Sequence, residues 1–299
     1  MKLLVSDPIS GRAIDGIKSL GIELDYKPDV DAEELKQIIK IYDGIVVRSR
    51  TKVRKELIDI ASNLKFIIRG GVGLDNIDVE YAKSKGIKVF NTPAASSISV
   101  AELSIAFMFA LSRHIVKGTD SLRKNEWLKK KLKGTELFGK TLGILGMGRI
   151  GREVAKRAIC LGMKVIGYDP YIKGVDIEGV ILTSLEDVLS NADIITLHLP
   201  LTEETRHMIN KDSFEKMKNG VILINCARGG IVDENALYEY LKNGKVKGAG
   251  FDVFEKEPPE GNKLFDLDNF YATPHIGAST SEGQDRVGEE IVRILKEIE

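Results

Sequence analysis

The sequence predicts an α/β fold with two doubly wound parallel sheets, and three observations support that prediction. Short, uninterrupted apolar runs alternate with segments of helical periodicity, a pattern typical of parallel strands that helices cover on both faces. This alternation stops after Asn91 and restarts at Thr141, which indicates two units. The length of 299 residues agrees with two units, since one domain typically takes about 100–200 residues.

The first unit is predicted to be a small α/β domain. Its strands are expected at the apolar runs of residues 3–5, 45–47, 66–68 and 87–90. Between them, helical spacing joins two groups of apolar residues, Leu35 with Ile38 and Ile39, and Val53 with Leu57, Ile58 and Ala61. A loop at residues 91–93 then breaks the pattern, and residues 97–111 are predicted to form a long, largely buried helix.

The second unit restarts the alternation and is predicted to be doubly wound as well. We expect its strands at residues 141–145, 164–168, 194–197, 221–224, 246–251 and 270–273. In an open parallel sheet, ligands bind outside the carboxyl ends of the strands. Residues that directly follow these strands are therefore the first candidates for a functional site.

The C-terminal segment is predicted to be a helix. Ser279 and Glu282 have the spacing of a capping box, and apolar residues then recur on one face at Val287, Ile291, Ile294, Leu295 and Ile298. Because the second unit does not need another helix, we expect this one to pack on the first. The predicted domains are therefore a discontinuous one, residues 1–93 plus 276–299, and an inserted one, residues 94–275, with a cleft between them.

Composition and charge exclude several classes of protein. Lys plus Arg and Asp plus Glu both number 44, and this balance argues against nucleic acid or an anionic membrane surface as a partner. Cys160 and Cys226 form no CxxC pair, which favours a reducing, intracellular setting. No apolar run reaches membrane-spanning length, and no secretory signal is evident, so a cytoplasmic protein is expected. No spacing of His, Cys or carboxylates indicates a metal site.

A glycine turn after the strand at residues 141–145 predicts a dinucleotide site. Gly146 is expected to make the tight turn, Gly148 to let the backbone approach a pyrophosphate, and Gly151 to allow close packing of helix and strand. Asp169 ends the next strand, where a ribose diol needs an acceptor. Its charge would repel a 2′-phosphate, and the next residues, Pro170 (a further candidate for cofactor binding) and Tyr171, supply no arginine, so NAD is favoured over NADP.

Three loops that follow later strands carry candidate catalytic residues, namely Arg228, Glu257 and His275. Oxidising an alcohol with a nicotinamide requires a base, a group that orients the base, and a cation for a carboxylate or oxyanion. His275, Glu257 and Arg228 suit these three roles in that order. Taken singly, His275 could instead be a loop hydrogen-bonding residue, and Arg228 could cap a helix or bind the cofactor.

The first unit has two candidate substrate loops. Gly70, Gly71 and Val72 form a glycine-rich turn after a strand, suited to presenting N–H groups to a carboxylate, although an ordinary tight turn fits too. Arg48, Ser49 and Arg50 follow another strand. Arg50 is either a phosphate-binding cation or a solvated surface charge.

Six segments together resemble the D-isomer-specific 2-hydroxyacid dehydrogenases, and the resemblance covers essentially the whole chain. They are RGGVGLDNID, VAELSIAFMFAL, ILGMGRIG, NCARGGIVDE, DVFEKEPP and TPHIGAST. The resemblance implies a Rossmann NAD-binding domain inserted into a flavodoxin-like substrate domain. It is strongest to members that oxidise D-3-phosphoglycerate with NAD, the first step of L-serine biosynthesis, and it implies that reaction.

The resemblance also implies roles for individual residues. Arg228 would bind the substrate carboxylate and carbonyl, Glu257 would pair with His275, and His275 would move the proton. Asp252 would hold the nicotinamide carboxamide. Further cofactor contacts are expected from Arg149, Ile150, His198, Leu199, Pro200, Cys226, Ala227, Gly277 and Ala278. In the phosphoglycerate enzymes a basic residue of the Arg48–Arg50 loop meets the phosphate.

The family resemblance finally implies a homodimer formed through the NAD-binding domains, because the helix from Ser97 and residues 113–133 resemble its dimer-forming elements. The chain ends where the catalytic unit ends, so no C-terminal, serine-binding regulatory domain is expected. A glyoxylate or hydroxypyruvate reductase is the nearest alternative. An NADH-sensing, partner-binding co-repressor is a second alternative, against which the absence of added docking segments argues.

Overall fold

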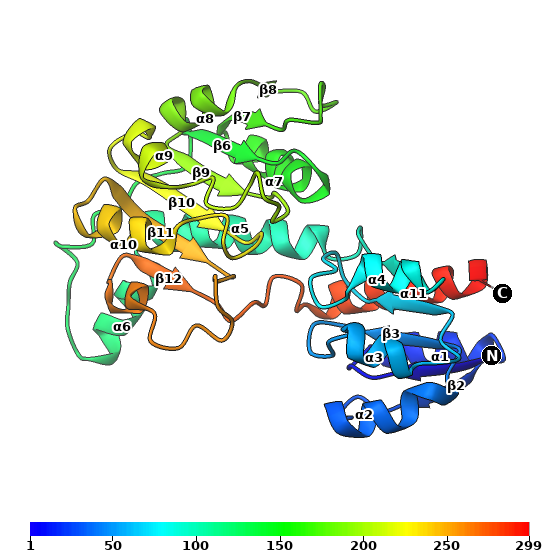
Figure 1. Ribbon diagram of the computed structural model, residues 1–299. Coiled ribbons are helices and arrows are strands. Elements are labelled where there is room, and N and C mark those ends of the chain that lie inside the picture. Colours follow the sequence, from blue (N-terminus) through cyan, green and yellow to red (C-terminus); the bar gives the residue numbers. More distant parts are fainter. Residues whose placement is uncertain (299) are drawn as a thin grey trace. The chain divides into compact units, whose positions relative to one another are not determined.

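The computed structural model describes residues 1–298, and the chain forms two compact units (Figure 1). The first unit contains residues 1–97 together with the C-terminal segment from Ala278, and the second contains residues 98–277. One sheet has five strands and the other seven, and every strand pair is parallel. The predicted fold class, two parallel α/β sheets, is confirmed.

The sheet of the first unit has the order β2-β1-β3-β4-β5. Its strands are β1 (Lys2–Val5), β2 (Glu23–Tyr26), β3 (Gly44–Val47), β4 (Phe66–Arg69) and β5 (Lys88–Asn91). The helices are α1 (Gly11–Ser19), α2 (Ala32–Ile38), the short 3₁₀ helix η1 (Ile39–Ile41), α3 (Lys55–Ile60), α4 (Val79–Ser84) and α11 (Ser281–Ile298). Because β3 is buried along its whole length, its run GIVV carries no polar residue.

Helix α11 completes the core of the first unit. Its residues Val287, Ile291 and Leu295 pack in one hydrophobic cluster with β1 and β4. A Cβ on Gly288 would lie 2.5 Å from Cβ of Ala13, so the glycine allows α11 to approach α1 closely. The expected capping box is wrong by one residue, because Oγ1 of Thr280, and not Ser279, accepts the hydrogen bond from the Gly283 N–H.

The sheet of the second unit has the order β12-β11-β10-β9-β6-β7-β8. Its strands are β6 (Thr141–Leu145), β7 (Lys164–Tyr168), β8 (Val180–Leu182), β9 (Ile194–Leu197), β10 (Val221–Asn225), β11 (Val246–Phe251) and β12 (Phe270–Ala272). The strand order reverses between β6 and β9, which is the position where doubly wound folds bind their ligands. The glycine turn follows β6 directly, so the topology places it at this switch point.

Helices surround the seven-stranded sheet. They are α5 (Ser97–Ser112), α6 (Ile115–Arg123), α7 (Arg149–Cys160), α8 (Leu185–Asn191), α9 (Lys211–Lys216), α10 (Glu234–Lys242) and the 3₁₀ helix η2 (Lys263–Asp266). Helix α5 contributes Ala101, Phe107 and Met108 to the core. No single helix within residues 1–298 is long and apolar enough to cross a membrane, although α5 and α6 meet that length and hydropathy as a pair bent by 61°.

Candidate active site

In the glycine turn after β6, two of the three positions, Gly146 and Gly151, have no room for a side chain, each for its own reason. Gly146 has φ +99°, and a Cβ there would lie 2.5 Å from the carbonyl oxygen of His198. A Cβ on Gly151 would lie 2.0 Å from the Gly146 oxygen. A Cβ on Gly148 would meet nothing within 4 Å. The space beside Gly148 is therefore open, as close approach of a pyrophosphate requires.

Helix α7 begins at this turn with an uncapped end. Its N-cap is Gly148, and among residues 1–298 no side chain caps the first turn of the helix. The N–H groups of Arg149 and Ile150, with the positive end of the helix dipole, form a ready anion site. The turn and the helix therefore fit the phosphates of NAD.

Asp169 connects the end of β7 to the glycine turn. Its Oδ2 accepts a 2.9 Å hydrogen bond from the Met147 N–H, and its Oδ1 accepts from the N–H groups of Tyr171 (2.9 Å) and Ile172 (3.2 Å). These bonds hold the half-buried carboxyl group of Asp169 beside the turn. The remaining lone pairs can accept from a ribose diol. Pro170 is exposed and has no N–H to donate.

Glu257 and His275 form a direct pair. Oε2 of Glu257 lies 2.8 Å from Nδ1 of His275, and Oε1 accepts a 3.1 Å hydrogen bond from the Phe254 N–H. Burial alone would raise the pKa of Glu257, but the hydrogen bond and charge of His275, the Phe254 N–H and the charge of Arg228 outweigh it and lower that pKa. Glu257 is therefore a carboxylate at neutral pH, able to hold Nδ1 in its protonated form.

Arg228 lies in a loop that packs against the loop of Glu257. Buried Asn225 shapes the Arg228 loop: its Nδ2 donates to the Arg228 carbonyl (3.0 Å) and its Oδ1 accepts from the Ala227 N–H (3.1 Å). A Cβ on Gly229 would lie 1.8 Å from the carbonyl oxygen of Phe254, so only glycine allows the two loops to pack this closely. Asn225 is a positioning residue that the sequence analysis missed, because side-chain bonds within a folded loop leave no periodic signal.

Asp252 holds the loop of His275. Its buried carboxylate accepts hydrogen bonds from Thr273 Oγ1 (2.5 Å), the Ile276 N–H (2.8 Å) and the Gly277 N–H (2.7 Å). These bonds fix a loop in which His275 has φ +54°, a left-handed conformation. The family resemblance implies that Asp252 and Gly277 contact the cofactor. In the structure, the Asp252 carboxylate already has three donors and the Gly277 N–H already has an acceptor.

His198 and Cys226 follow β9 and β10, and both are kept uncharged. Burial lowers the pKa of the His198 imidazole to about 3. Its Nε2 shares a 3.0 Å hydrogen bond with Thr196 Oγ1, while the buried Nδ1 has no partner among residues 1–298. Burial raises the pKa of the Cys226 thiol to about 12, so this cysteine is no nucleophile at neutral pH.

The other expected cofactor residues occupy neighbouring strand ends. Leu199 and Ala227 are buried in the core of the second unit, and Pro200 is exposed beside them. Ala278 begins the segment that returns to the first unit. The assigned roles of these residues stay predictions.

The expected substrate loops both lie in the first unit. Asp7, almost fully buried, accepts hydrogen bonds from the Arg48 N–H, from Thr51 and from Arg50 Nε, the last at 3.0 Å. The guanidinium of Arg50 also donates to the carbonyl groups of Ser6 and Pro28. Arg50 therefore shapes its own loop, whereas Arg48 is half-buried and Ser49 is exposed.

The guanidinium of Arg69 lies over the glycine-rich turn at residues 70–72 of the first unit. Gly71 has φ +150°, and a Cβ there would lie 1.5 Å from Nη1 of Arg69. The guanidinium of Arg69 thus lies over Gly71. The side chain of Asn91 donates to the Val72 carbonyl at 2.6 Å and fixes the turn. Arg69 was not predicted as a site residue, because in the sequence it is the last residue of a strand.

Within residues 1–298, no three His, Cys, Asp or Glu residues are grouped to hold a metal ion.

A doubly wound nucleotide fold with a carboxylate–histidine pair and a nearby arginine defines the class of nicotinamide-dependent dehydrogenases. Residues 105–277 match the family model described as the D-isomer specific 2-hydroxyacid dehydrogenase, NAD binding domain. The chain belongs to the D-isomer specific 2-hydroxyacid dehydrogenase family. It is accordingly an NAD-dependent enzyme that acts on 2-hydroxy acids.

Three relatives illustrate the range of the family. The chain is 52% identical to a hydroxypyruvate reductase of Thermotoga maritima, over 98% of this chain and 97% of that protein. It is 49% identical to a D-3-phosphoglycerate dehydrogenase of Methanocaldococcus jannaschii, over 100% of this chain but only 57% of that protein. Among solved structures, it resembles the D-lactate dehydrogenase of Aquifex aeolicus in complex with NAD and lactic acid, with TM-score 0.85, 36% identity, and coverage of 99% and 94%.

Proposed function

We propose that the protein oxidises D-3-phosphoglycerate to 3-phosphohydroxypyruvate with NAD, as the first step of L-serine biosynthesis. The contact of 2.8 Å between Glu257 and His275, with Arg228 in the adjacent loop, carries the proposal for the chemistry. The likeness to phosphoglycerate dehydrogenases, at 49–50% identity across this whole chain in two archaeal relatives, supports the choice of substrate.

Proton transfer is the task of His275 in this mechanism. Glu257 accepts a hydrogen bond from Nδ1 of His275, which leaves Nε2 free to take the proton of the substrate 2-hydroxyl. Bound NAD supplies the hydride acceptor for C2 of the substrate. Arg228 offers a planar fork of donors, which suits two-point binding of the carboxylate and the developing carbonyl. In the reverse direction, His275 begins protonated and donates.

Replacing His275 by Asn tests the assignment of the proton carrier. We expect kcat to fall by about 10²–10⁴-fold, the usual contribution of a general base, while NADH still binds. Steady-state kinetics and titration of NADH fluorescence measure the two quantities. A variant with near wild-type kcat would show that another group moves the proton.

Substrate phosphate binding is assigned to the first unit. Arg48, Ser49 and Arg50 form one loop, and the turn at residues 70–72 lies beneath Arg69. We assign Arg48 and Arg69 to the phosphate, with Gly70 and Gly71 presenting N–H groups to the carboxylate. Since Arg50 is bonded to Asp7 and two carbonyl groups, its role is to shape the loop.

A hydroxypyruvate or glyoxylate reductase is the second candidate function. The observation that favours it is the likeness to the Thermotoga maritima hydroxypyruvate reductase, which this chain matches over nearly the full length of both proteins. The three candidate catalytic residues suit either substrate, because both are 2-oxo acids in the reduction direction. Only the phosphate distinguishes hydroxypyruvate from 3-phosphohydroxypyruvate.

A single steady-state panel separates the candidates. It compares 3-phosphohydroxypyruvate, hydroxypyruvate and glyoxylate with NADH and with NADPH. We expect the highest kcat/KM with 3-phosphohydroxypyruvate and NADH, and Arg48→Met should lower that value while leaving kcat/KM for hydroxypyruvate nearly unchanged. A preference for hydroxypyruvate that Arg48→Met does not alter would select the reductase.

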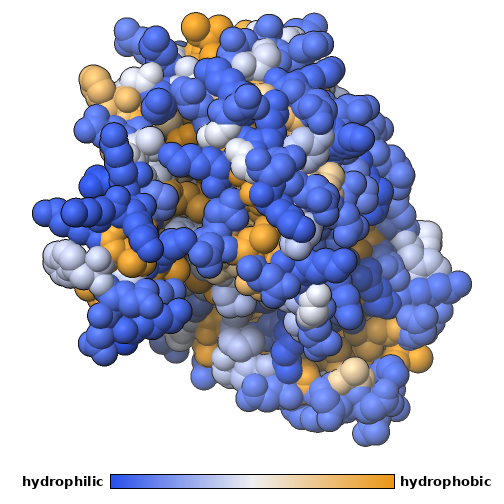
Figure 2. Space-filling view, turned by 90° about the vertical axis from the view of Figure 1, so that its left-hand side faces the viewer, coloured by the Kyte–Doolittle hydropathy of each residue, from blue (hydrophilic) through white to orange (hydrophobic). Residues whose placement is uncertain are grey.

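We further propose a homodimer that forms through the NAD-binding units. Large apolar side chains of α6 and of the loop after it are exposed: Ile115, Leu122, Trp127 and Phe138. Figure 2, which views the side that carries α6, shows orange, hydrophobic residues between blue, hydrophilic ones. A face of this kind is typical of protein–protein contact.

A further inference from the structure

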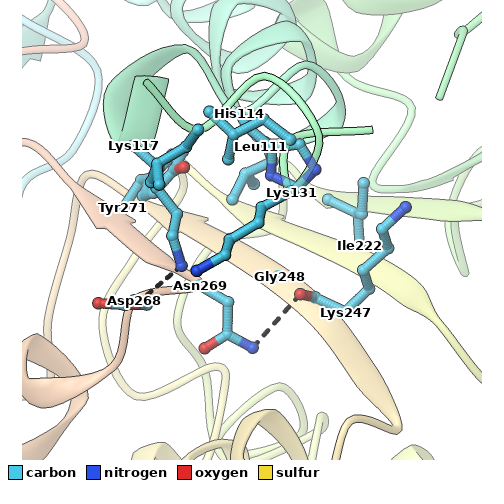
Figure 3. Close-up of a pocket in the computed structure, with 12 residues that line it drawn as sticks. Leu111, His114, Lys117, Lys131, Ile222, Lys247, Gly248, Asp268, Asn269 and Tyr271 are labelled. Carbon is cyan, nitrogen blue, oxygen red and sulfur yellow. Dashed lines mark hydrogen bonds and ion pairs between the residues drawn. The ribbon is translucent and has the colours of Figure 1, made fainter. Parts of the chain in front are cut away.

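The second unit contains a cavity at the end of its sheet that is opposite to the active-site loops. Its volume is about 190 Å³, and Ile222 of β10, Gly248 of β11 and Tyr271 of β12 contribute to its wall (Figure 3). These residues lie near the starts of three strands whose far ends lead into the loops of Arg228, Glu257 and His275. Gly248 and Asp252 are four residues apart, which is about 13 Å along a strand. The cavity is therefore separate from the candidate active site.

The floor of the cavity is apolar. Leu111 comes from α5 and Ile222 from β10, while Leu128 and Leu132 come from the loop between α6 and β6. The N–H groups of Lys131 and Leu132 both donate to the Leu128 carbonyl, at 2.8 and 3.2 Å, and this turn places both leucines on the cavity. A ligand with a hydrocarbon body could thus bury apolar surface here.

The rim of the cavity is basic. Lys117, Lys131 and Lys247 line it, and Asp268 is the one carboxylate among its lining residues. Asp268 is already paired with Lys117 at 2.8 Å, and that ammonium lowers the pKa of the Asp268 carboxyl. Figure 3 shows Lys117 and Lys131 extending their ammonium groups toward Asp268, while Lys247 extends in another direction.

Two of these lysines are not neutralised by the protein. Within residues 1–298, neither Lys131 nor Lys247 forms an ion pair, so the lining carries two more positive charges than negative ones when His114 is neutral. Like charges around an apolar hollow repel each other, and an anion that enters the hollow relieves the repulsion. The lining therefore suits a compact apolar body that carries a negative group.

We propose that this cavity binds a small organic carboxylate with a branched or aromatic apolar body. The carboxylate faces Lys131, Lys247 adds to the positive charge of the lining from another direction, and the body rests on Leu111, Leu128, Leu132 and Ile222. The occupant connects the loop after α6 to the starts of β10–β12 and so restrains that loop. The proposal does not rest on the proposed substrate, because the cavity shares no residue with the active site.

The test uses 4-methylpentanoate as the probe, with its neutral amide as the charge control and inorganic phosphate as a bare anion. Trp127, the one tryptophan of the chain, directly precedes Leu128 and reports binding by fluorescence, and calorimetry gives the stoichiometry. We expect one equivalent of carboxylate to bind with a roughly millimolar Kd, as befits so small a ligand. The amide and phosphate should each bind at least about fivefold more weakly, since each lacks one of the two features that the cavity recognises.

Charge variants locate the site. Lys131→Met should weaken binding by about two- to fivefold, as expected for loss of an exposed charge pair, and Lys247→Met should weaken it less, because its ammonium group extends in another direction. Lys130→Met is the matched control, because Lys130 is an exposed neighbour that does not line the cavity, and it should leave the Kd unchanged. Hydrogen exchange should slow in residues 124–133 when the probe is bound.

A second variant distinguishes binding in the cavity from binding at the active site, which is also proposed to bind carboxylates. Arg228→Gln removes the cation proposed to bind the substrate carboxylate, and binding of 4-methylpentanoate should persist in it. Loss of binding in Arg228→Gln, equal affinity for acid and amide, or equal effects of Lys130→Met and Lys131→Met would each overturn the proposal. None of these outcomes depends on which 2-hydroxy acid the enzyme oxidises.

Discussion

One buried polar side chain holds each of two active-site loops: Asn225 holds the loop of Arg228, and Asp252 holds the loop of His275. The sequence predicts Arg228, Glu257 and His275 as site residues, because residues that follow parallel strands meet at one edge of a sheet. The positioning roles of Asn225 and Asp252 could not be predicted in the same way. Their partners are N–H, carbonyl and hydroxyl groups of loops, which any sequence supplies and only the folded chain orients.

Replacing Asp252 by Asn tests this positioning role. An amide NH₂ would face one of the two backbone N–H donors, and leaving a buried donor unpaired costs about 1–3 kcal/mol. We expect a less ordered His275 loop and a kcat about 10–100-fold lower, in proportion to that cost, with little change in the dissociation constant of NADH. Pre-steady-state hydride transfer and NADH titration separate the two effects.

Thr273→Val provides a graded control, since it removes the hydroxyl donor to Asp252 and keeps both backbone donors. It should lower kcat less than Asp252→Asn does. If Asp252→Asn instead weakened NADH binding and spared kcat, the carboxylate would act on the nicotinamide, as the family resemblance implied, and the loop-holding role would be wrong.

His198 gives stability a pH dependence of defined sign. The pKa of its imidazole is lowered from 6.5 to about 3 in the folded protein, so the unfolded chain binds more protons between these values. The contribution of His198 to the free energy of unfolding is therefore fully present above pH 6.5 and decreases as the pH falls. At pH 5 the free energy of unfolding is about 2 kcal/mol lower for this reason. Urea unfolding measures it, and His198→Gln should flatten this slope. An NMR titration that showed the ring protonating above pH 5 would contradict the assignment.

At the scale of elements, the buried strands and the edge strands β5 and β12 were predicted, whereas the edge strands β2 and β8 were not. Strands such as β3 and β9 are buried on both faces and read as apolar runs. Strand β2 has the sequence ELDY with no buried residue, and β8 has three residues and pairs only with β7. An edge strand pairs on one side and need not bury its side chains, so the sequences of β2 and β8 resemble those of loops.

Close packing between loops also depends on single glycines. Replacing Gly229 by Ala would place a Cβ 1.8 Å from the Phe254 carbonyl oxygen and force the loops of Arg228 and Glu257 apart. Overpacking of this kind costs about 1–3 kcal/mol, and we expect kcat/KM to fall by at least about 10²-fold because two candidate catalytic side chains move. Thermal unfolding and kinetics measure both.

Gly174→Ala is the matched control for Gly229→Ala. A Cβ on Gly174 meets nothing within 4 Å, and its φ lies outside the positive range, so stability and activity should stay at wild-type values. A Gly229→Ala enzyme that kept full activity would mean that the two loops tolerate separation. Their close packing would then have no part in arranging Arg228 beside Glu257.

At the scale of the whole molecule, the exposed apolar face of the second unit bears on assembly. Trp127 is 78% exposed, Phe138 73%, Leu122 58% and Ile115 53%, and all four lie in α6 or in the loop after it. Isolated exposed apolar residues are ordinary, but four large ones within 24 positions are apolar area that a partner would shield from water. A second copy of the chain offers the same face, as a two-fold dimer requires.

Sedimentation velocity tests the dimer through paired variants. Leu122→Glu with Trp127→Glu should shift the protein from dimer to monomer, because burying two carboxylates in an apolar contact is strongly unfavourable. Ile181→Glu is the control: Ile181 is 65% exposed but lies on the edge strand β8, so the dimer should persist. A wild-type protein that sediments as a monomer at all concentrations would refute the assembly. A dimer that survives Leu122→Glu and Trp127→Glu but not Ile181→Glu would move the interface to the edge of the sheet at β8.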